Sequence, residues 1–465
     1  MAGISASANI KAILKIVYKD GVQSLLFRNS PLLRALGKTR IEGKEFRFAA
    51  VYGRGGATGG DYTFVRAQAI ETARNVEWKT IPGQMFSALT INQKEIMASR
   101  SRRGAYMTVL GNKTFAALEG MRKQLAVALY GTGYGEFAFG LPETTLVVGS
   151  NSVTLDEQQV IGVDVGTTFR AVEPNTSSGS LGSGATVMPS INVITALDGA
   201  RITFTATAAD EWDETTVLVF EGSRDAEGNP LLPIGLEGWL PTNANRSGAG
   251  WTGFIANPFY GVNRSVATDR LAGQFVLSPA AGSYKIADVI TELFRRCRRA
   301  GAEVDMIVLN DKKFAELMAE METQRNYWQA ITGPGKGDKP EAVNGLSAIM
   351  YAFSTSWIGK TVDDPYCPYN KAYCLETKNL ELVTYSNVEP VTSDGIAENE
   401  PGKAAPESEE GRDYTAQGCR INIDDIVTIE PGVATAEGPS QCVSFNIYGT
   451  FTLYNTGNAG VAVLQ

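Results

Sequence analysis

The spacing of apolar residues predicts one long helix, and the rest of the chain is arranged around it. Between residues 105 and 130, apolar side chains recur at steps of three, four and seven, which places them on one helical stripe. No proline interrupts the segment, Gly131 follows as a stop, and the helix would be about 39 Å long. The residues of the stripe are Tyr106, Leu110, Ala117, Met121, Leu125 and Ala128.

Two glycines lie inside this helix, Gly111 and Gly120. Each is expected to weaken a helix by about 1 kcal/mol relative to alanine. We interpret them as candidate bend points of the helix.

Residues 39–91 alternate with period two and predict a long β-hairpin. The stretches DYTFVRAQ, NVEWKTI and QMFSALTI are interpreted as its returning strands. An isolated hairpin is marginally stable in water, so we expect support from a neighbouring subunit. The glycine-dense tip of this hairpin contains Gly53, Gly55, Gly56, Gly59 and Gly60.

The remaining chain divides by changes of pattern. Residues 142–222 hold many short strands and predict a β-sandwich or barrel inserted into another domain. Residues 283–390 alternate helix and strand, with helices expected at 286–300 and from 311 to about 329, and predict a compact α+β domain. The other divisions are an N-terminal arm at 1–38, the helical region 92–141, a connection at 223–282, a polar acidic loop at 391–419, and returning strands at 420–465.

Charge is distributed unevenly over the 465 residues. The first 140 residues carry a net charge of +11, while the remainder carries −19. Such a division suggests an anionic partner or the association of unlike surfaces between copies. The best candidates for contact with DNA phosphates or with a neighbouring subunit flank or lie in the long helix: Arg100, Arg102, Arg103, Lys113, Arg122 and Lys123.

The composition argues against catalysis. The chain contains no histidine, which excludes Ser-His-Asp and Cys-His sites and His-based metal sites. Its five cysteines include no CxxC pair, so we expect reduced thiols and no metal, cofactor or catalytic residues. No apolar run is long enough to span a membrane, and the N-terminus lacks signal-peptide features, which favours production in a cytoplasm.

The order of these parts resembles the major capsid proteins of tailed double-stranded-DNA phages, the Hong Kong 97-type shell fold. The stretches NSPLLRALGKTRIEGKEFRF, GLEGWL and MIVLNDKKF carry the resemblance most clearly. It implies an α+β fold with an N-arm, an E-loop hairpin, a spine helix in a peripheral P-domain and an axial A-domain. The β-rich block at 142–222 has no counterpart in the minimal fold.

The resemblance also implies a function. The chain would form pentamers and hexamers that close into an icosahedral shell around phage DNA, assembled in the host cytoplasm and found in the virion. A separate scaffolding protein, a portal protein at one vertex and a decoration protein are implied partners, with no membrane. Two alternatives remain open: an encapsulin-like nanocompartment, and a histidine-free carbohydrate-active enzyme with a β binding module.

Overall fold

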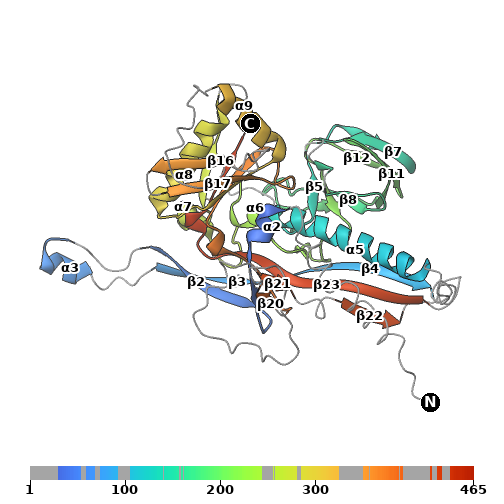
Figure 1. Cartoon of the computed structure of the whole chain (residues 1–465), viewed down its shortest axis with the longest axis horizontal. Helices are drawn as coiled ribbons and strands as arrows, with labels where there is room; N and C mark the ends of the chain where they lie inside the picture. The colour runs from blue at the N-terminus through green and yellow to red at the C-terminus, as the bar shows by residue number, and fades with distance from the viewer. Residues whose placement is uncertain are drawn as a thin grey trace, which may run out of the picture.

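The computed structural model shows a mixed α+β chain built on three principal β-sheets (Figure 1). No helix among the described residues is long and apolar enough to cross a membrane. The structure describes residues 30–53, 59–68, 74–92, 105–139, 141–156, 159–160, 162–242, 255, 257–279, 284–323, 349–354, 357–386, 388–390, 419–421, 427–431 and 440–464.

The predicted long helix is confirmed as α5, with the expected limits Ala105–Tyr130. It lies along β4 (Gly83–Asn92), which pairs over its whole length with β23 (Ser440–Leu453) (Figure 1). On its C-terminal half the buried residues Leu118, Met121, Leu125 and Leu129 follow the helical period and enter the main core. The other strands of this sheet are β1 (Gly37–Arg40), β19 (Leu380–Thr384) and β22 (Val427–Pro431).

The hairpin is shorter than expected, and two of its assigned strands are wrong. β2 (Phe46–Gly53) pairs with β3 (Arg74–Thr80). The stretch QMFSALTI belongs to β4 in the α5 sheet, because alternation alone does not identify the partner strand. The stretch DYTFVRAQ forms the helix α3 (Tyr62–Gln68), whose first turn Asp61 caps by accepting from the Thr63 N–H at 2.8 Å.

The β-rich block has a sheet and a core of its own. Seven strands pair in one sheet, two more pair in a small second sheet, and Phe169, Phe204 and Trp212 pack together at the centre. That the block is an inserted domain remains a prediction. The strands are β5 (Glu136–Ala138), β6 (Thr144–Leu146), β7 (Gly149–Thr154), β8 (Thr168–Glu173), β9 (Thr186–Val187), β10 (Asn192–Asp198), β11 (Arg201–Ala206), β12 (Asp210–Trp212) and β13 (Val217–Phe220).

The third sheet carries two helices. The first, α8 (Ile286–Ala300), has the expected limits and ends at Gly301, whose φ of 101° is left-handed. The second, α9 (Asp311–Thr323), begins as expected, and the further residues expected to continue it lie outside the described part of the chain. The sheet contains β14 (Gln274–Leu277), β24 (Gly460–Val463), β18 (Lys371–Leu375), β15 (Met306–Leu309), β17 (Trp357–Asp363) and β16 (Ile349–Ser354), in that order.

Short elements connect these sheets. The expected turn after Ser30 is confirmed as α2 (Pro31–Ala35), with Pro31 in its first turn and the Ser30 Oγ accepting from the Leu33 N–H at 3.3 Å. The acidic loop predicted at 391–419 lies outside the described residues except for Cys419. The remaining elements are α6 (Leu236–Trp239), η3 (Arg264–Val266), α7 (Thr268–Leu271), η4 (Thr377–Asn379), η7 (Thr456–Asn458), β20 (Val388–Pro390) and β21 (Cys419–Ile421).

Candidate assembly surfaces

The base of the hairpin is anchored on the chain's own core by a cluster of aromatic rings. Trp78 of β3 lies 5.2 Å from Trp239 and 5.9 Å from Phe259 between ring centroids, and Phe48 of β2 stacks 6.4 Å from Trp78. Trp239 donates its indole N–H to the Phe451 carbonyl at 2.7 Å. The chain's own core therefore supports the base of the hairpin, and support from a neighbouring subunit remains a prediction.

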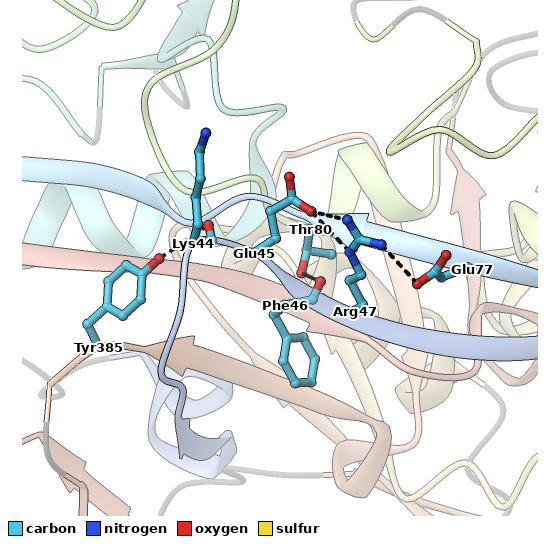
Figure 2. Close-up of polar contacts among 7 residues, drawn as sticks. All are labelled: Lys44, Glu45, Phe46, Arg47, Glu77, Thr80 and Tyr385. Atoms are coloured by element: carbon cyan, nitrogen blue, oxygen red, sulfur yellow. Dashed lines mark hydrogen bonds and ion pairs between the residues drawn. The ribbon is translucent and has the colours of Figure 1, made fainter.

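The opposite face of the hairpin is open to solvent and carries charged residues near its base. Arg47 lies between Glu45 and Glu77, donating to the Glu45 carboxylate at 2.8 and 3.0 Å (Figure 2). That hydrogen bond and the positive charge of Arg47 lower the pKa of Glu45, so the pair stays ionised at neutral pH. At the foot of the hairpin, the Tyr385 hydroxyl donates to the Lys44 carbonyl at 3.4 Å, which holds the turn before β2.

The far end of the hairpin carries apolar side chains that nothing in the described chain covers. Helix α3 lies at the left end of Figure 1, away from the three sheets. On this helix Tyr62 is 76% exposed and Phe64 is 56% exposed. Two large apolar side chains on one short exposed helix indicate a contact surface for another molecule.

The predicted glycine tip is only partly described. Gly53 ends β2, where a Cβ would lie 2.9 Å from the Arg74 Cβ, so close pairing with β3 favours glycine there. Gly59 and Gly60 are exposed and precede α3. Gly55 and Gly56 lie outside the described residues.

Of the basic residues proposed for DNA or subunit contact, the structure describes the side chains of Arg122 and Lys123, and these two lie in different surroundings. Arg122 is a correction: its side chain is 6% exposed and donates to Glu119 one helical turn earlier, with Nε at 2.9 Å, because the residue faces the core. Lys123 is 24% exposed and binds both oxygens of Asp164 in the β block, at 2.7 and 2.8 Å. Lys113 lies in α5 with no described side chain, and Arg100, Arg102 and Arg103 lie outside the described residues.

The two helix glycines lie inside an uninterrupted α5. A Cβ added at Gly120 would meet no atom within 4 Å, so packing does not require glycine there. The space around Gly111 lies outside the part of the chain that the structure describes. The bending role of both glycines remains a prediction.

One buried carboxylate joins three parts of the fold. Asp364, at the end of β17, accepts from the Ser30 hydroxyl at 2.7 Å and from the Tyr130 hydroxyl at 2.9 Å. Ser30 caps α2 and Tyr130 ends α5, so the arm, the long helix and the third sheet meet at this group. Burial raises the pKa of Asp364, although these hydrogen bonds oppose the shift. From the sequence, the adjacent pair Asp363 and Asp364 near a strand end is expected to be solvated. That expectation is wrong for Asp364, which is fully buried, because the pair carries no signal of burial.

The described cysteines are structural and unreactive. Cys297, Cys367 and Cys374 are free and buried, and burial raises the pKa of the Cys297 thiol to about 12. A thiol that remains protonated is a poor nucleophile and a poor metal ligand. Within the described ranges, no group of three or more Cys, Asp or Glu residues is arranged to hold a metal ion.

No protein-family profile and no curated protein matches the chain. Solved structures do match its overall arrangement. The cyanophage A-1(L) capsid asymmetric unit has 12% sequence identity and a TM-score of 0.48, covering 94% of this chain and 92% of that chain. The capsid of a native GTA particle has 8% identity and a TM-score of 0.40, covering 95% and 90%. The holo-SrpI encapsulin complex from Synechococcus elongatus PCC 7942 has 10% identity and a TM-score of 0.37, covering 94% and 88%.

These sequence identities are 12% or lower and the TM-scores are below 0.5, so function has to be argued from the chain's own features. The chain has an α+β fold in which a short helix, a projecting hairpin, a long helix packed on a long strand, a β block and a separate α/β sheet follow one another. Apart from the β block, which has no counterpart in the minimal fold, that is the order which the resemblance to Hong Kong 97-type capsid proteins implies.

Proposed function

We propose that the protein is the major capsid protein of a tailed double-stranded-DNA phage, a shell subunit without enzymatic activity. The observation that carries the proposal is the hairpin: its base is locked into the core through Trp78, while its far end presents Tyr62 and Phe64 to solvent. A hairpin with an anchored base and an uncovered apolar end is suited to bind a second subunit.

The charge distribution supports contact with like subunits and with DNA. The first 140 residues are basic and the remainder is acidic, so copies of one chain can offer complementary surfaces to each other. In pentamers and hexamers that close into an icosahedral shell, the same hairpin contact would be repeated from subunit to subunit. Packaged DNA would be held without sequence preference through basic residues that remain exposed, and not through Arg122.

The wider assembly follows from the same proposal. Its partners would be a separate scaffolding protein, a portal protein at one vertex and a decoration protein on the outer face. The shell would assemble in a host cytoplasm and persist in the virion. An encapsulin-like shell is the second candidate, favoured by the similarity in overall arrangement to the encapsulin complex.

The test changes the exposed end of the hairpin and leaves its base intact. Tyr62→Ser with Phe64→Ser should leave a folded subunit that no longer forms shells or tubes, seen by negative-stain microscopy with and without a scaffolding protein. Thr63→Ala, on the same exposed helix, is the matched control and should assemble normally. Shell formation by the double variant, or no assembly by the unmodified chain in either condition, would refute the proposal. Nucleic acid inside purified particles would separate a phage shell from a protein-filled compartment.

A further inference from the structure

Strand β7 forms an open edge of the seven-stranded sheet. It is the last strand in the order β5-β13-β8-β10-β11-β7 and pairs with β11 along all six of its residues. Figure 1 shows it at the outer margin of the β block. No other strand within the described ranges pairs with it.

The phase of the hydrogen bonds identifies which backbone groups point outward. The Leu155 N–H donates to the Ala200 carbonyl at 2.9 Å, so Leu155 is a hydrogen-bonded position of the β7–β11 ladder. Because such positions alternate in an antiparallel pair, Val153, Asn151 and Gly149 also bond toward β11. The N–H and C=O groups of Ser150, Ser152 and Thr154 therefore face away from the sheet, six groups in all.

This edge lacks the features that normally prevent strand pairing. Exposed edges are usually protected by charged residues, proline or bulges. The hairpin follows that rule, since Arg47, Glu77 and Lys79 are exposed on it. In contrast, β7 reads GSNSVT and contains neither charge nor proline, and Ser150, Ser152 and Thr154 present small exposed side chains.

The edge is also held in an extended shape. The Asn151 amide donates to the Val147 carbonyl at 2.6 Å and to the Gly149 carbonyl at 3.0 Å, and its oxygen accepts from the Val147 N–H at 3.1 Å. These bonds fix the entry of the strand. A preordered edge loses less conformational entropy when a partner strand binds.

We propose that β7 pairs antiparallel with β7 of a second copy of this chain, around a two-fold axis at Ser152. In this register Ser152 faces Ser152 of the partner subunit, and Ser150 faces Thr154 of the partner subunit. All six outward groups of each strand are then hydrogen-bonded, giving six N–H···O bonds across the axis.

A second copy fits this edge better than a partner of different chemistry. An uncharged strand offers nothing of its own that would select an acidic or basic peptide. Self-pairing brings small Ser and Thr side chains together on the exposed face, beside the Arg201 guanidinium that donates to each Ser152 hydroxyl. The pairing requires two copies but no closed shell, so it goes beyond the proposed function and can fail independently of it.

Cysteine cross-linking of the full-length chain tests the axis. Residues facing each other at a hydrogen-bonded antiparallel position have Cα atoms about 5.5 Å apart, which suits a disulfide. Ser152→Cys should therefore give a covalent dimer on a non-reducing gel after mild oxidation. Thr154→Cys is the matched control, because two copies of residue 154 would lie about 14 Å apart along the strands and should not cross-link. A dimer yield from Ser152→Cys no greater than from Thr154→Cys or the unmodified chain would overturn the proposal.

A second variant removes only an outward donor. Ser152→Pro deletes an N–H that β11 does not use, and edge strands tolerate proline at such positions. Loss of two hydrogen bonds across the axis should weaken the β7 dimer about tenfold in sedimentation experiments. Ser152→Ala, which also removes the 2.7 Å bond from Arg201 to the Ser152 hydroxyl, is the control. Equal association of the Pro and Ala variants would overturn the pairing, and microscopy of the same samples reports shell formation separately.

Discussion

Replacing Trp78 should release the hairpin from the core. Trp78 is 1% exposed and contacts the rings of Phe48, Trp239 and Phe259. Truncating a buried tryptophan to alanine costs about 3–5 kcal/mol, through lost burial and the cavity that remains. The aromatic contacts contribute to that cost because each pair adds about 0.5–1.5 kcal/mol beyond burial.

The lost stabilisation should appear as local opening of the hairpin and not only as global unfolding. The rest of the main core includes α5 and β23, which keep their own contacts. An opening free energy lowered by about 3–5 kcal/mol raises the open population about 10²- to 4 × 10³-fold. Trypsin should then cleave at the exposed basic residues of the hairpin, such as Arg74 and Lys79, at a correspondingly higher rate.

The assay compares Trp78→Ala with Asn75→Ala, an exposed position on the same strand. Early cleavage sites are identified by mass spectrometry, and circular dichroism checks that both variants are folded. The rate should rise in Trp78→Ala alone. Cleavage of Trp78→Ala no faster than that of Asn75→Ala would show that the aromatic cluster does not hold the hairpin.

Two further predictions concern the junction and the long helix. Burial raises the pKa of Asp364, so the protonated carboxyl is favoured in the folded state. The stabilisation that the protonated carboxyl contributes is complete below about pH 3.8 and is lost as the pH rises through the pKa of the folded state. Asp364→Asn should remove that decline from urea-unfolding curves measured across pH. It should also lower the free energy of unfolding by about 1–3 kcal/mol, because the two hydroxyls donate to one carboxylate oxygen and the Tyr366 N–H donates to the other, whereas an amide supplies only one acceptor oxygen. An unchanged pH profile would contradict this. Gly120→Ala should raise the free energy of unfolding of the subunit by about 1 kcal/mol, as measured by thermal unfolding, because a methyl group there meets open space. If the helix must bend during assembly, Gly111→Ala with Gly120→Ala should also impair procapsid formation, and normal assembly and expansion of that variant would remove the bending role.

The amino-acid sequence predicted the elements whose signal is local. The limits of α5 and α8 agree with the structure, because an apolar stripe, the absence of proline and a following glycine act within one helix. The cap of α2 at Ser30 is of the same kind. The density of short strands in the β block was likewise visible from alternation and turn residues, although its strand order was not.

Tertiary structure decided what depends on distant partners. The strand β4 belongs to β23, more than 300 residues away, and β1 lies parallel to β19, because burial against α5 and the main core selects these pairings over an equally alternating local hairpin. The same packing turned Arg122 inward to Glu119 and buried Asp364 between Ser30 and Tyr130. The sequence by itself thus determined most of the helices and strands, α3 excepted, because neighbouring residues carry the helical or strand period. Which surfaces are buried and which stay open for another subunit was decided only by how the sheets pack together.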